Sequence, residues 1–552
     1  MSLRSDINKY TPRKEQSDAL QFVKKTYSEN AKIKFFLLDL PVGVGKSHLA
    51  IMLSDWYSRA NNGTKIDIIT AGKILQDQYD TSYESINNLK GKENYDCNQY
   101  ACSCANGKEF NRLNKTTCDA CPYDSARNGY ISGKVSLTNF HLYLTYALYN
   151  QSIVEGREST MLIVDECDML DSVMSDFISI KITENVVKKL KFTNEAKVLK
   201  ALKSVSTISE YVSFLEFMKV ELAVTIGSLD SSMQGDRSAK SDKRDLKISK
   251  IVGGGNKDVK LMQIINDLRQ YQMKIDLFLS EYNSNPDNWV LETNWNDKNQ
   301  KELSLEPIWA YDYLDKYVWS NYDTVILMSG TILDKNLFSE LNGLDAENTV
   351  YYSVESPFPI QNRIIYYMPL GKMSYQRKEE TFGNYKPFIY KLLKKYEGKK
   401  GIIHTNSFEL SDWIRRDIED TRLLFHTSSN KEEMLRLHME GKDPTVFVSP
   451  SVGTGVSFDH ERSRFQIIAK VPYPSLASQK NKLRQKNNPD WYAYRTVAGL
   501  IQMYGRSIRS KTDFADTIIL DGSFGDILKY SSKFIPQWFS SSIKRVDVKL
   551  GQ

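Results

Sequence analysis

A lysine and a serine follow a short apolar segment and a glycine-containing turn near the start of the chain. In "KFFLLDLPVGVGKSHLAIML", Gly43 and Gly45 lie in the turn, and a helical apolar spacing begins at Ser47. Backbone N–H groups of such a turn can surround phosphate oxygens, and the helix N-terminus adds partial positive charge. The segment therefore predicts a P-loop for ATP, in which Lys46 reaches the β- and γ-phosphates and Ser47 binds Mg²⁺.

The predicted turn departs from the usual P-loop pattern at one position. Leu40 stands where the first glycine is normally found. A chance glycine-rich turn is the alternative interpretation, but the strand before it and the helix after it favour the P-loop. The nucleotide-binding residues expected here are Val42, Gly43, Val44, Gly45, Lys46, Ser47 and His48.

Two adjacent carboxylates end a second apolar segment, "MLIVDECDML". A buried strand followed at once by Asp165 and Glu166 places both acids at the carboxyl edge of a parallel sheet, where ligands of such sheets bind. Charged residues often simply end strands, which is the alternative. Together with the P-loop, the pair predicts that Asp165 holds Mg²⁺ through water and that Glu166 orients and deprotonates an attacking water.

Two arginines lie close together in "LIQMYGRSIRSKTDFADTIILDGSF". Arg506 and Arg509 share one face if this segment is helical. A positive side chain that reaches a γ-phosphate from another domain stabilises transition-state charge in many NTPases. A solvated basic turn is the alternative interpretation.

Five of the six cysteines fall within one short stretch. Disulfides are rare in a reducing compartment, so these thiols indicate metal or cluster ligands. Only the last two form a CxxC knuckle of the kind that zinc sites commonly use, and four thiolates can equally hold a [4Fe-4S] cluster. Spacing alone leaves zinc and iron-sulfur open, with four ligands to be chosen from Cys97, Cys102, Cys104, Cys118 and Cys121.

The composition is that of an ordinary globular protein. The 552 residues are 41% hydrophobic and 26% charged, enough for three or four domain-sized units. No run approaches the ~18 apolar residues of a membrane span, and the first residues lack the apolar core of a secretory signal. We therefore predict a cytoplasmic protein. Lysine and arginine exceed aspartate and glutamate by 74 to 68, which permits nucleic-acid binding without arguing for it.

The order of these motifs resembles that of the XPD/DinG-like (Rad3-type) superfamily 2 helicases, the iron-sulfur-containing branch, over nearly the full chain. Each match is short, but the ordered set is specific. The matching segments are "YTPRKEQ" (Q motif), "LPVGVGKS" (motif I), "IITAGKILQDQY" (Ia), "VSLTNFHLYL" (the strand and loop after the cluster), "VDECD" (II), "LMSGTILD" (III), "SPFP" (the linker into the second motor domain), "GIIHTNSFELSDWI" (IV), "SPSVGTGVSFD" (V) and "QMYGRSIRS" (VI).

The resemblance implies an ATP-dependent DNA helicase that moves 5' to 3' on single-stranded DNA and unwinds forked duplex. Gln16 is then the expected adenine contact, with Arg13 nearby. The flanks "LKGKENYDC" and "CPYDSARNGY" resemble the family's sequences around its first and last cluster ligands. They favour [4Fe-4S] over zinc. Cys97, Cys118 and Cys121 are the preferred ligands, and Cys104 is placed ahead of Cys102 for the fourth position.

Two motifs depart from the family pattern. Cys167 and Asp168 replace the Ala and His of the usual DEAH sequence, where that His couples the nucleotide site to motifs III and VI. We expect Asp168 to accept hydrogen bonds from Gln502 or Arg506 instead. Thr454 and Ser457 stand in motif V where the family usually has Glu and Asp.

Short apolar strands alternate with helical stretches, which predicts an α/β fold. We expect two RecA-like parallel-sheet motor domains, the first interrupted by a small iron-sulfur cluster domain and by a mainly helical arch domain. The predicted ranges are 1–88, 136–170 and 300–345 for the first motor domain, 89–135 for the cluster domain, 171–299 for the arch and 346–552 for the second motor domain.

Single-stranded DNA would lie across both motor domains and would be held largely without regard to sequence. Tyr95 and Tyr123, beside cluster ligands, could stack on bases or pack against the cluster. We expect a monomer with no membrane association. The rival interpretation is an ATP-switched nucleic-acid-binding remodeller or scaffold that does not separate strands. Candidate DNA contacts from motif position are Thr70, Asn139, Thr405, Asn406 and Thr454.

Overall fold

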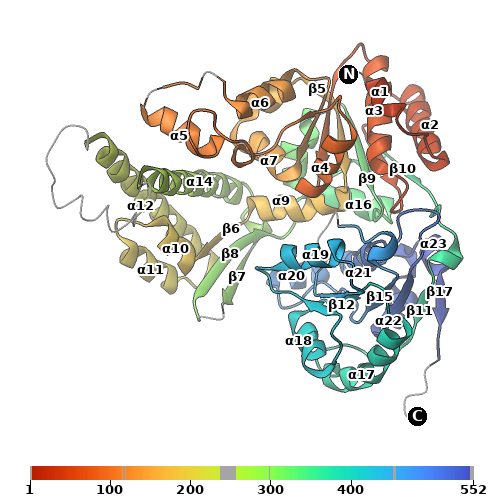
Figure 1. Cartoon of the computed structure of the whole chain (residues 1–552). Coiled ribbons are helices and arrows are strands. Elements are labelled where there is room, and N and C mark those ends of the chain that lie inside the picture. The colour runs from red at the N-terminus through yellow and green to blue at the C-terminus, as the bar shows by residue number, and fades with distance from the viewer. Residues whose placement is uncertain are drawn as a thin grey trace.

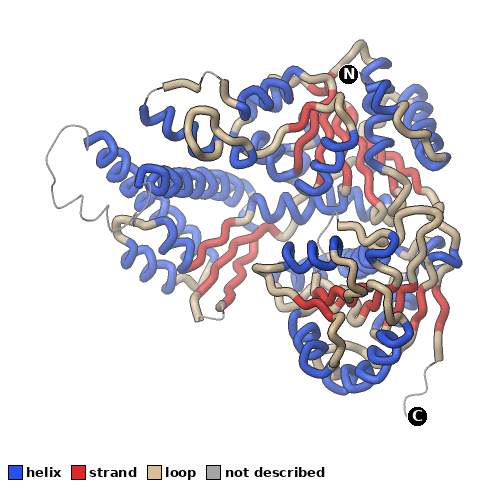
Figure 2. The backbone as a smooth tube through the Cα atoms, in the orientation of Figure 1, coloured by secondary structure: helices blue, strands red, loops and turns tan. Residues whose placement is uncertain are grey.

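The computed structural model describes residues 3–114, 116–118, 120–235, 257–296, 299–451 and 456–547. Two seven-stranded sheets, each parallel throughout, form two lobes, and a third group of helices and strands projects beside them (Figure 1). Figure 2 shows that helices lie on both sides of each large sheet. The predicted α/β class with two parallel sheets is confirmed.

The first lobe is built on a sheet whose strands come from distant parts of the chain. Its order is β10 (Thr349–Ser353), β1 (Phe35–Asp39), β9 (Thr324–Ser329), β5 (Ser159–Asp165), β2 (Lys65–Thr70), β4 (Val135–Asn139) and β3 (Asn87–Asn88). Both β1 and β5 pair with β9, so the segments that follow them emerge at the same edge, one strand apart. β10 lies beyond residue 345, where the sequence placed the end of this domain, because its apolar residues pair with β1.

Helices cover both faces of the first sheet. Phe36 and Leu38 belong to one buried cluster, whereas Phe35 and Leu37 belong to another on the opposite face. This alternation follows from the two-residue period of a strand, and burial on both faces explains the continuous apolar run. The helices of this lobe are α1 (Leu3–Ile7), α2 (Lys14–Glu29), α3 (Lys46–Ala60), α4 (Lys73–Ser82), α7 (Phe140–Tyr149), α8 (Gln151–Glu155), α9 (Leu170–Ile178), α15 (Tyr311–Tyr317) and α16 (Lys335–Asn342).

A small insertion between β3 and β4 carries the five clustered cysteines. It contains α5 (Cys104–Asn114) and α6 (Pro122–Ser132). Its core joins Leu89 and Tyr130 to Tyr146 and Ile153 of the first lobe. α5 also approaches the long helix α14, where Arg269 Nη1 lies 3.6 Å from Glu109 Oε2 (Figure 1).

The second insertion combines helices with an antiparallel sheet. The sequence predicted a mainly helical unit and missed β6 (Ile180–Thr183), β7 (Trp289–Trp295) and β8 (Lys301–Pro307), which pair in the order β6-β8-β7. β8 falls within the range assigned to the first motor domain, but it pairs with β6 and β7 because together they bury an apolar face. The helices of this unit are α10 (Glu184–Leu190), α11 (Glu195–Ser204), α12 (Ile208–Gly235) and α14 (Lys257–Ser284).

The second lobe has the same layered plan as the first. Its strands run in the order β13 (Leu423–Phe425), β14 (Val446–Ser449), β12 (Gly401–His404), β15 (Phe465–Ile468), β16 (Asp516–Ile519), β11 (Ile365–Tyr367) and β17 (Ile543–Arg545). The covering helices are α17 (Lys378–Lys395), α18 (Phe408–Asp417), α19 (Lys431–Glu440), α20 (Gln479–Asn487), α21 (Pro489–Tyr504), α22 (Ser523–Tyr530) and α23 (Gln537–Ser540).

Helix α20 joins the second lobe to the first lobe, and also to the antiparallel unit, where the Lys480 N–H donates to Glu292 Oε1 at 2.9 Å. Arg484 donates to both carboxylate oxygens of Asp171, at 2.8 and 3.1 Å, and its guanidinium lies over the rings of Trp309 and Trp491. This buried contact fixes the lobes beside each other. Within the described part of the chain, no helix has both the length and the apolar composition that crossing a membrane requires.

Candidate nucleotide-hydrolysis site between the two lobes

The predicted P-loop connects β1 to α3 at the carboxyl edge of the first sheet. Gly43 and Gly45 have φ angles of +86° and +89°, which disfavour any residue with a side chain. A Cβ at Gly43 would lie 2.1 Å from the Phe358 ring, and one at Gly45 would lie 2.4 Å from Gln16 Nε2. Both glycines are therefore required by conformation and by space. The turn ends where Lys46 begins α3.

Arg13 and Gln16 of the predicted Q motif donate hydrogen bonds to the P-loop backbone. Gln16 Nε2 donates to the carbonyl oxygen of Gly45 at 2.8 Å, and Arg13 donates to that of Gly43. Gln16 also accepts a hydrogen bond from the Arg13 N–H at 2.8 Å, which closes the start of α2. These contacts hold the start of α2 against the phosphate-binding turn.

The P-loop lysine faces the carboxylates that follow β5. Lys46 Nζ lies 3.2 Å from Glu166 Oε1. Burial alone would lower the pKa of Lys46, but Glu166 and Asp165 outweigh it and the pKa is raised. Burial likewise opposes ionisation of Glu166, yet Lys46, Arg509 and Arg506 together lower its pKa. Lys46 and Glu166 therefore stand as a cation and an anion at the same edge of the sheet.

Asp165 and Glu166 differ in their surroundings. Burial raises the pKa of Asp165 to about 6, although Lys46 acts in the opposite direction. One Asp165 oxygen accepts the Glu166 N–H at 3.1 Å. Glu166 has a φ of +60°, a left-handed conformation that costs a residue with a side chain some strain and is often found at functional sites.

The remaining P-loop residues are buried around this turn. Val44 is fully buried, and Val42 lies against the second lobe, because a Cβ added to Gly505 would meet Val42 Cγ2 at 2.8 Å. His48 packs against the Tyr10 ring at 5.4 Å, and burial lowers the pKa of its imidazole.

Tyr79 of α4 contacts a predicted magnesium ligand, and the sequence did not single it out. Its hydroxyl donates to Asp165 Oδ2 at 2.9 Å, and burial raises the pKa of that hydroxyl although the nearby Ser47 side chain acts to lower it. The only sequence signal was its place at the end of the segment that resembles motif Ia.

The two arginines lie in the loop after α21 and not on a helix. α21 ends at Tyr504, so the one-face arrangement that a helix would give is absent from this described segment. Arg506 donates to the Val456 carbonyl oxygen at 3.0 Å. Burial lowers the pKa of Arg509 to about 10, and Arg506 acts in the same direction, whereas Glu166 acts to raise it. Arg506 and Arg509 thus lie near enough to Glu166 for both to lower the pKa of its carboxyl group.

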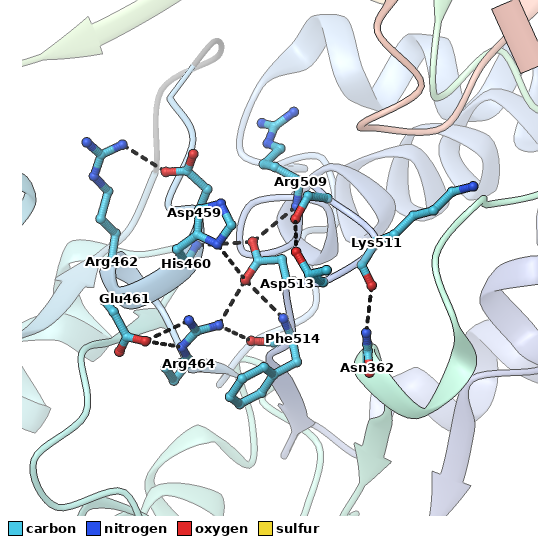
Figure 3. Close-up of polar contacts among 12 residues, drawn as sticks. Asn362, Asp459, His460, Glu461, Arg462, Arg464, Arg509, Lys511, Asp513 and Phe514 are labelled. Carbon is cyan, nitrogen blue, oxygen red and sulfur yellow. Dashed lines mark hydrogen bonds and ion pairs between the residues drawn. The ribbon is translucent and has the colours of Figure 1, made fainter. Parts of the chain in front are cut away.

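Asp513 fixes the loop that carries these arginines. It is fully buried and accepts hydrogen bonds from Arg464 Nη1 at 2.9 Å and from the backbone N–H groups of His460 and Arg509 at 3.1 and 3.3 Å. Figure 3 shows the Arg509 guanidinium extending away from this network. Asp513 therefore holds the backbone of Arg509, while the Arg509 side chain is free to line the cavity between the lobes.

A cavity of about 360 Å³ lies where these groups meet. It joins the end of β5 in the first lobe to the loop after α21 in the second. Acidic, basic and amide side chains from both lobes point to one space, as a site for a charged ligand between two domains requires. Its lining residues are Val42, Leu75, Gln78, Glu166, Asp168, Met169, Ser457, Asp459, Gln502, Gly505, Arg506 and Arg509.

Asp168 connects three of the predicted motifs. It accepts hydrogen bonds from Gln502 of α21 and, at 2.6 Å, from Ser329 at the end of β9. Arg495, which the sequence did not single out, donates to its carbonyl oxygen at 3.1 Å. The contact with Gln502 is one of the two alternatives predicted for this residue, whereas Arg506 binds Val456 instead.

Four of the candidate DNA contacts already bind other protein groups through their side chains. Thr70 donates to the Gly72 carbonyl, Asn139 caps α7 and donates to Gln76, Thr405 contacts Ser411, and Asn406 donates to the Lys470 carbonyl. Thr454 lies outside the described residues.

The two tyrosines beside the cysteines are packed within the insertion. Tyr123 is only 2% exposed, and its hydroxyl contacts that of Tyr146 at 2.5 Å. The Tyr95 ring lies edge-on to Tyr123, with centroids 5.8 Å apart. The packing alternative therefore describes Tyr123 better than base stacking does.

The cysteines gather in one small core. The Cys104 and Cys121 sulfur atoms are 3.9 Å apart, and Cys97 and Cys118 pack against the same buried cluster. Cys102 is half-buried, and its carbonyl oxygen accepts a hydrogen bond from the Cys97 N–H at 2.8 Å. Among the described residues, no group of three or more His, Cys, Asp or Glu side chains is arranged to hold a metal ion. Four of the five thiols therefore share one core, but the described cysteine side chains are not arranged around a common metal position.

Comparisons with known proteins find similar sequences for both lobes. A family model described as a helicase C-terminal domain matches residues 389–542, and one described as the res subunit of type III restriction enzymes matches residues 9–193. The chain is similar to the ATP-dependent DNA helicase DinG of Photobacterium profundum, at 21% identity over 94% of both chains.

Two further similarities differ in extent. The probable ATP-dependent helicase MJ0942 of Methanocaldococcus jannaschii is 24% identical over 46% of this chain and only 42% of that protein, so less than half of the relative is matched. A solved XPD helicase structure has the same fold over 98% of this chain and 100% of that one, with a TM-score of 0.61 at 15% identity. With its motifs in the expected order, the chain is similar to the XPD/DinG-like, Rad3-type branch of the superfamily 2 helicases in its sequence motifs and in its fold.

Proposed function

We propose that this protein is an ATP-dependent DNA helicase that couples ATP hydrolysis to movement along single-stranded DNA. The observation that carries the proposal is the cavity between the lobes. Glu166 lines it from the first lobe, with Lys46 Nζ 3.2 Å from its carboxylate, and Gln502, Arg506 and Arg509 line it from the second. A site shared by two domains changes when they close on a nucleotide, and such closure can drive steps along a strand.

The residues around the cavity suit phosphoryl transfer to water. Ser47 and Asp165 would hold Mg²⁺, which when bound neutralises charge on the β- and γ-phosphates. Glu166 has a lowered pKa and is therefore a carboxylate able to orient a water and accept its proton. Lys46 binds the phosphates, and Arg506 and Arg509 offset the charge that develops during in-line attack.

The direction of movement and the separation of strands rest on the family relationship. We propose 5' to 3' movement on single-stranded DNA and unwinding of forked duplex. A pair of partial duplexes with either a 5' or a 3' single-stranded tail tests this. Faster unwinding of the 5'-tailed substrate supports the proposal, whereas preference for the 3' tail contradicts the polarity. DNA-stimulated ATP hydrolysis without strand separation would instead support the ATP-switched remodeller or scaffold.

We propose that the cysteine core holds a [4Fe-4S] cluster, with zinc as the alternative occupant. Thiolates are the ligands that such clusters use, and four of the five cysteines belong to one core. The 3.9 Å approach of Cys104 to Cys121 favours Cys104 over Cys102 as the fourth ligand. Bound to thiolates on both sides of α5, a cluster would brace this small insertion.

Metal analysis after anaerobic purification separates these alternatives. Iron with matching sulfide and a brown colour supports the cluster, and stoichiometric zinc without sulfide contradicts it. Cys104→Ser is expected to lose iron while Cys102→Ser retains it, and the reverse result would exchange the two assignments.

The cytoplasmic location and the monomeric state expected from the sequence belong to the same proposal. Light scattering of the purified protein, alone and with an oligonucleotide, tests the second of these. A mass near that of one 63.5 kDa chain is expected.

A further inference from the structure

Helix α4 lies between the cavity, the predicted magnesium ligands and the edge of the first sheet. Leu75 and Gln78 line the cavity. Gln76 and Tyr79 are both fully buried. Because they are three residues apart, these two side chains lie on one face of the helix.

Tyr79 is placed to control the arrangement of a predicted magnesium ligand. Its hydroxyl donates to Asp165 Oδ2 at 2.9 Å, and the nearby Ser47 side chain acts to lower the pKa of that hydroxyl. The other Asp165 oxygen is fixed by the Glu166 N–H at 3.1 Å. Together, the tyrosine and this N–H set the orientation of the Asp165 carboxylate beside Ser47.

Gln76 ties the same helix to the edge where DNA is expected. Its side-chain oxygen accepts from Asn139 Nδ2 at 2.9 Å, and its nitrogen donates to the Leu89 carbonyl at 2.8 Å and to Asn88 at 2.6 Å. Asn139 is a candidate DNA contact, and Leu89 begins the cysteine-bearing insertion. A movement of either partner would shift α4 as a unit, because buried side chains pack too closely to move alone.

We propose that Tyr79 is a positioning residue that holds Asp165 in its magnesium-binding arrangement beside Ser47, and that α4 makes this arrangement sensitive to DNA. The inference rests on the proposed function, since it concerns the same nucleotide site. The proposed connection runs from the edge where DNA is expected, through Gln76 and Tyr79 of α4, to the metal ligands. All of its contacts lie within the first lobe. Removing an outer partner of a metal ligand commonly costs about 10- to 100-fold in metal affinity.

The first test measures metal binding directly. Mn²⁺ prefers the same oxygen ligands as Mg²⁺, and its paramagnetic resonance signal reports the free ion. Binding of Mn²⁺ in the presence of ADP is expected to weaken about tenfold in Tyr79→Phe, whereas binding of ADP in excess chelator is unchanged. Tyr57→Phe is the matched control, because it removes a buried hydroxyl that contacts Thr324 and Thr160 rather than a predicted metal ligand. Equal Mn²⁺ affinity in Tyr79→Phe and wild type would overturn the positioning role.

The second test repeats the titration with oligo(dT). If the two sites are coupled, DNA changes the affinity of the wild type for Mn²⁺ by some factor, and Mn²⁺ must change its affinity for DNA by the same factor. We expect this change to disappear in Tyr79→Phe and in Gln76→Leu, with folding of both checked by circular dichroism. If oligo(dT) changes the Mn²⁺ affinity of both variants as much as that of the wild type, the proposal that α4 makes the metal site sensitive to DNA is wrong. If the wild type itself fails to bind Mn²⁺ with ADP, the proposed function fails first.

Discussion

Gln502 of the second lobe donates a hydrogen bond to Asp168 of the first, across the cavity between them. The other oxygen of the same carboxylate accepts from Ser329 at 2.6 Å. Asp168 thus occupies the position of the usual histidine and still joins motifs II, III and VI. Burial and the neighbouring Glu166 raise the pKa of Asp168, while Ser329 and Arg495 act to lower it.

Removal of this carboxylate should uncouple the lobes. Asp168→Ala leaves Gln502 and Ser329 without their acceptor, and a buried polar group left unpaired costs about 1–3 kcal/mol. We expect DNA-stimulated ATP hydrolysis to fall about tenfold or more, while nucleotide binding changes little. In a double-mutant cycle, Asp168→Ala and Gln502→Ala should be non-additive. Additive losses in steady-state hydrolysis would show that the hydrogen bond carries no coupling.

Loss of Arg509 should affect catalysis more than binding. Its guanidinium is held close to Glu166 by a loop pinned at Asp513, so Arg509→Ala should lower kcat by about 10³-fold with a small change in ADP affinity. Arg416→Ala is a suitable control, because this exposed arginine pairs with Asp417 at the end of α18 and neither residue lines the cavity. Similar kcat values for Arg509→Ala and Arg416→Ala would contradict the assignment.

The buried ion pair at α20 should contribute strongly to stability. Arg484→Met leaves the Asp171 carboxylate buried without its bidentate partner, and breaking such a pair costs about 3–5 kcal/mol. We expect a corresponding decrease in the free energy of unfolding in urea. Adding Asp171→Leu should recover most of the loss, because no charge is then left unpaired. Failure of the double variant to recover would mean that stacking on Trp309 and Trp491 dominates.

Two buried histidines should make the second lobe sensitive to acid. Burial lowers the pKa of His404 and of His438 to about 4, from a usual value of 6.5. Between these pH values the unfolded chain binds more protons than the folded protein does. The free energy of unfolding is therefore undiminished above pH 6.5 and decreases as the pH falls toward 4. Each histidine should contribute a slope of about 1.4 kcal/mol per pH unit in that window.

Thermal or urea unfolding at about pH 7 and about pH 5, on either side of the usual histidine pKa, measures this effect. His404→Gln and His438→Gln should each lose less stability than the wild type on the same change of pH. A wild-type loss that neither substitution reduces would assign the acid sensitivity to other groups.

The sequence predicted which residues lie near one another at the site better than it predicted how they are arranged there. Gly43, Lys46 and Glu166 follow short apolar strands, and parallel strands bring their ends together, so local pattern was sufficient. The loop position of Arg509 was not predictable, because it depends on Asp513 and on contacts with distant Arg464. Tyr79 was missed for the same reason. Its hydroxyl reaches Asp165 only because the folded sheet places the end of β5 beside α4.

The antiparallel strands β6, β7 and β8 illustrate the same limit in the fold. They are short and separated by long helices, so their pairing is a tertiary property that no local pattern reveals. The Arg484 contact is similar, since a basic helix is usually solvated, and only the position of Asp171 makes it a buried connection.

Strand separation on a 5'-tailed forked duplex is the most direct test of the helicase assignment. The wild type should release the labelled strand in the presence of ATP and Mg²⁺, and Lys46→Ala should release none while it still binds the fork. ATP-dependent release that survives Lys46→Ala would contradict the proposed site. ATP hydrolysis by the wild type without any strand release would contradict the proposed function.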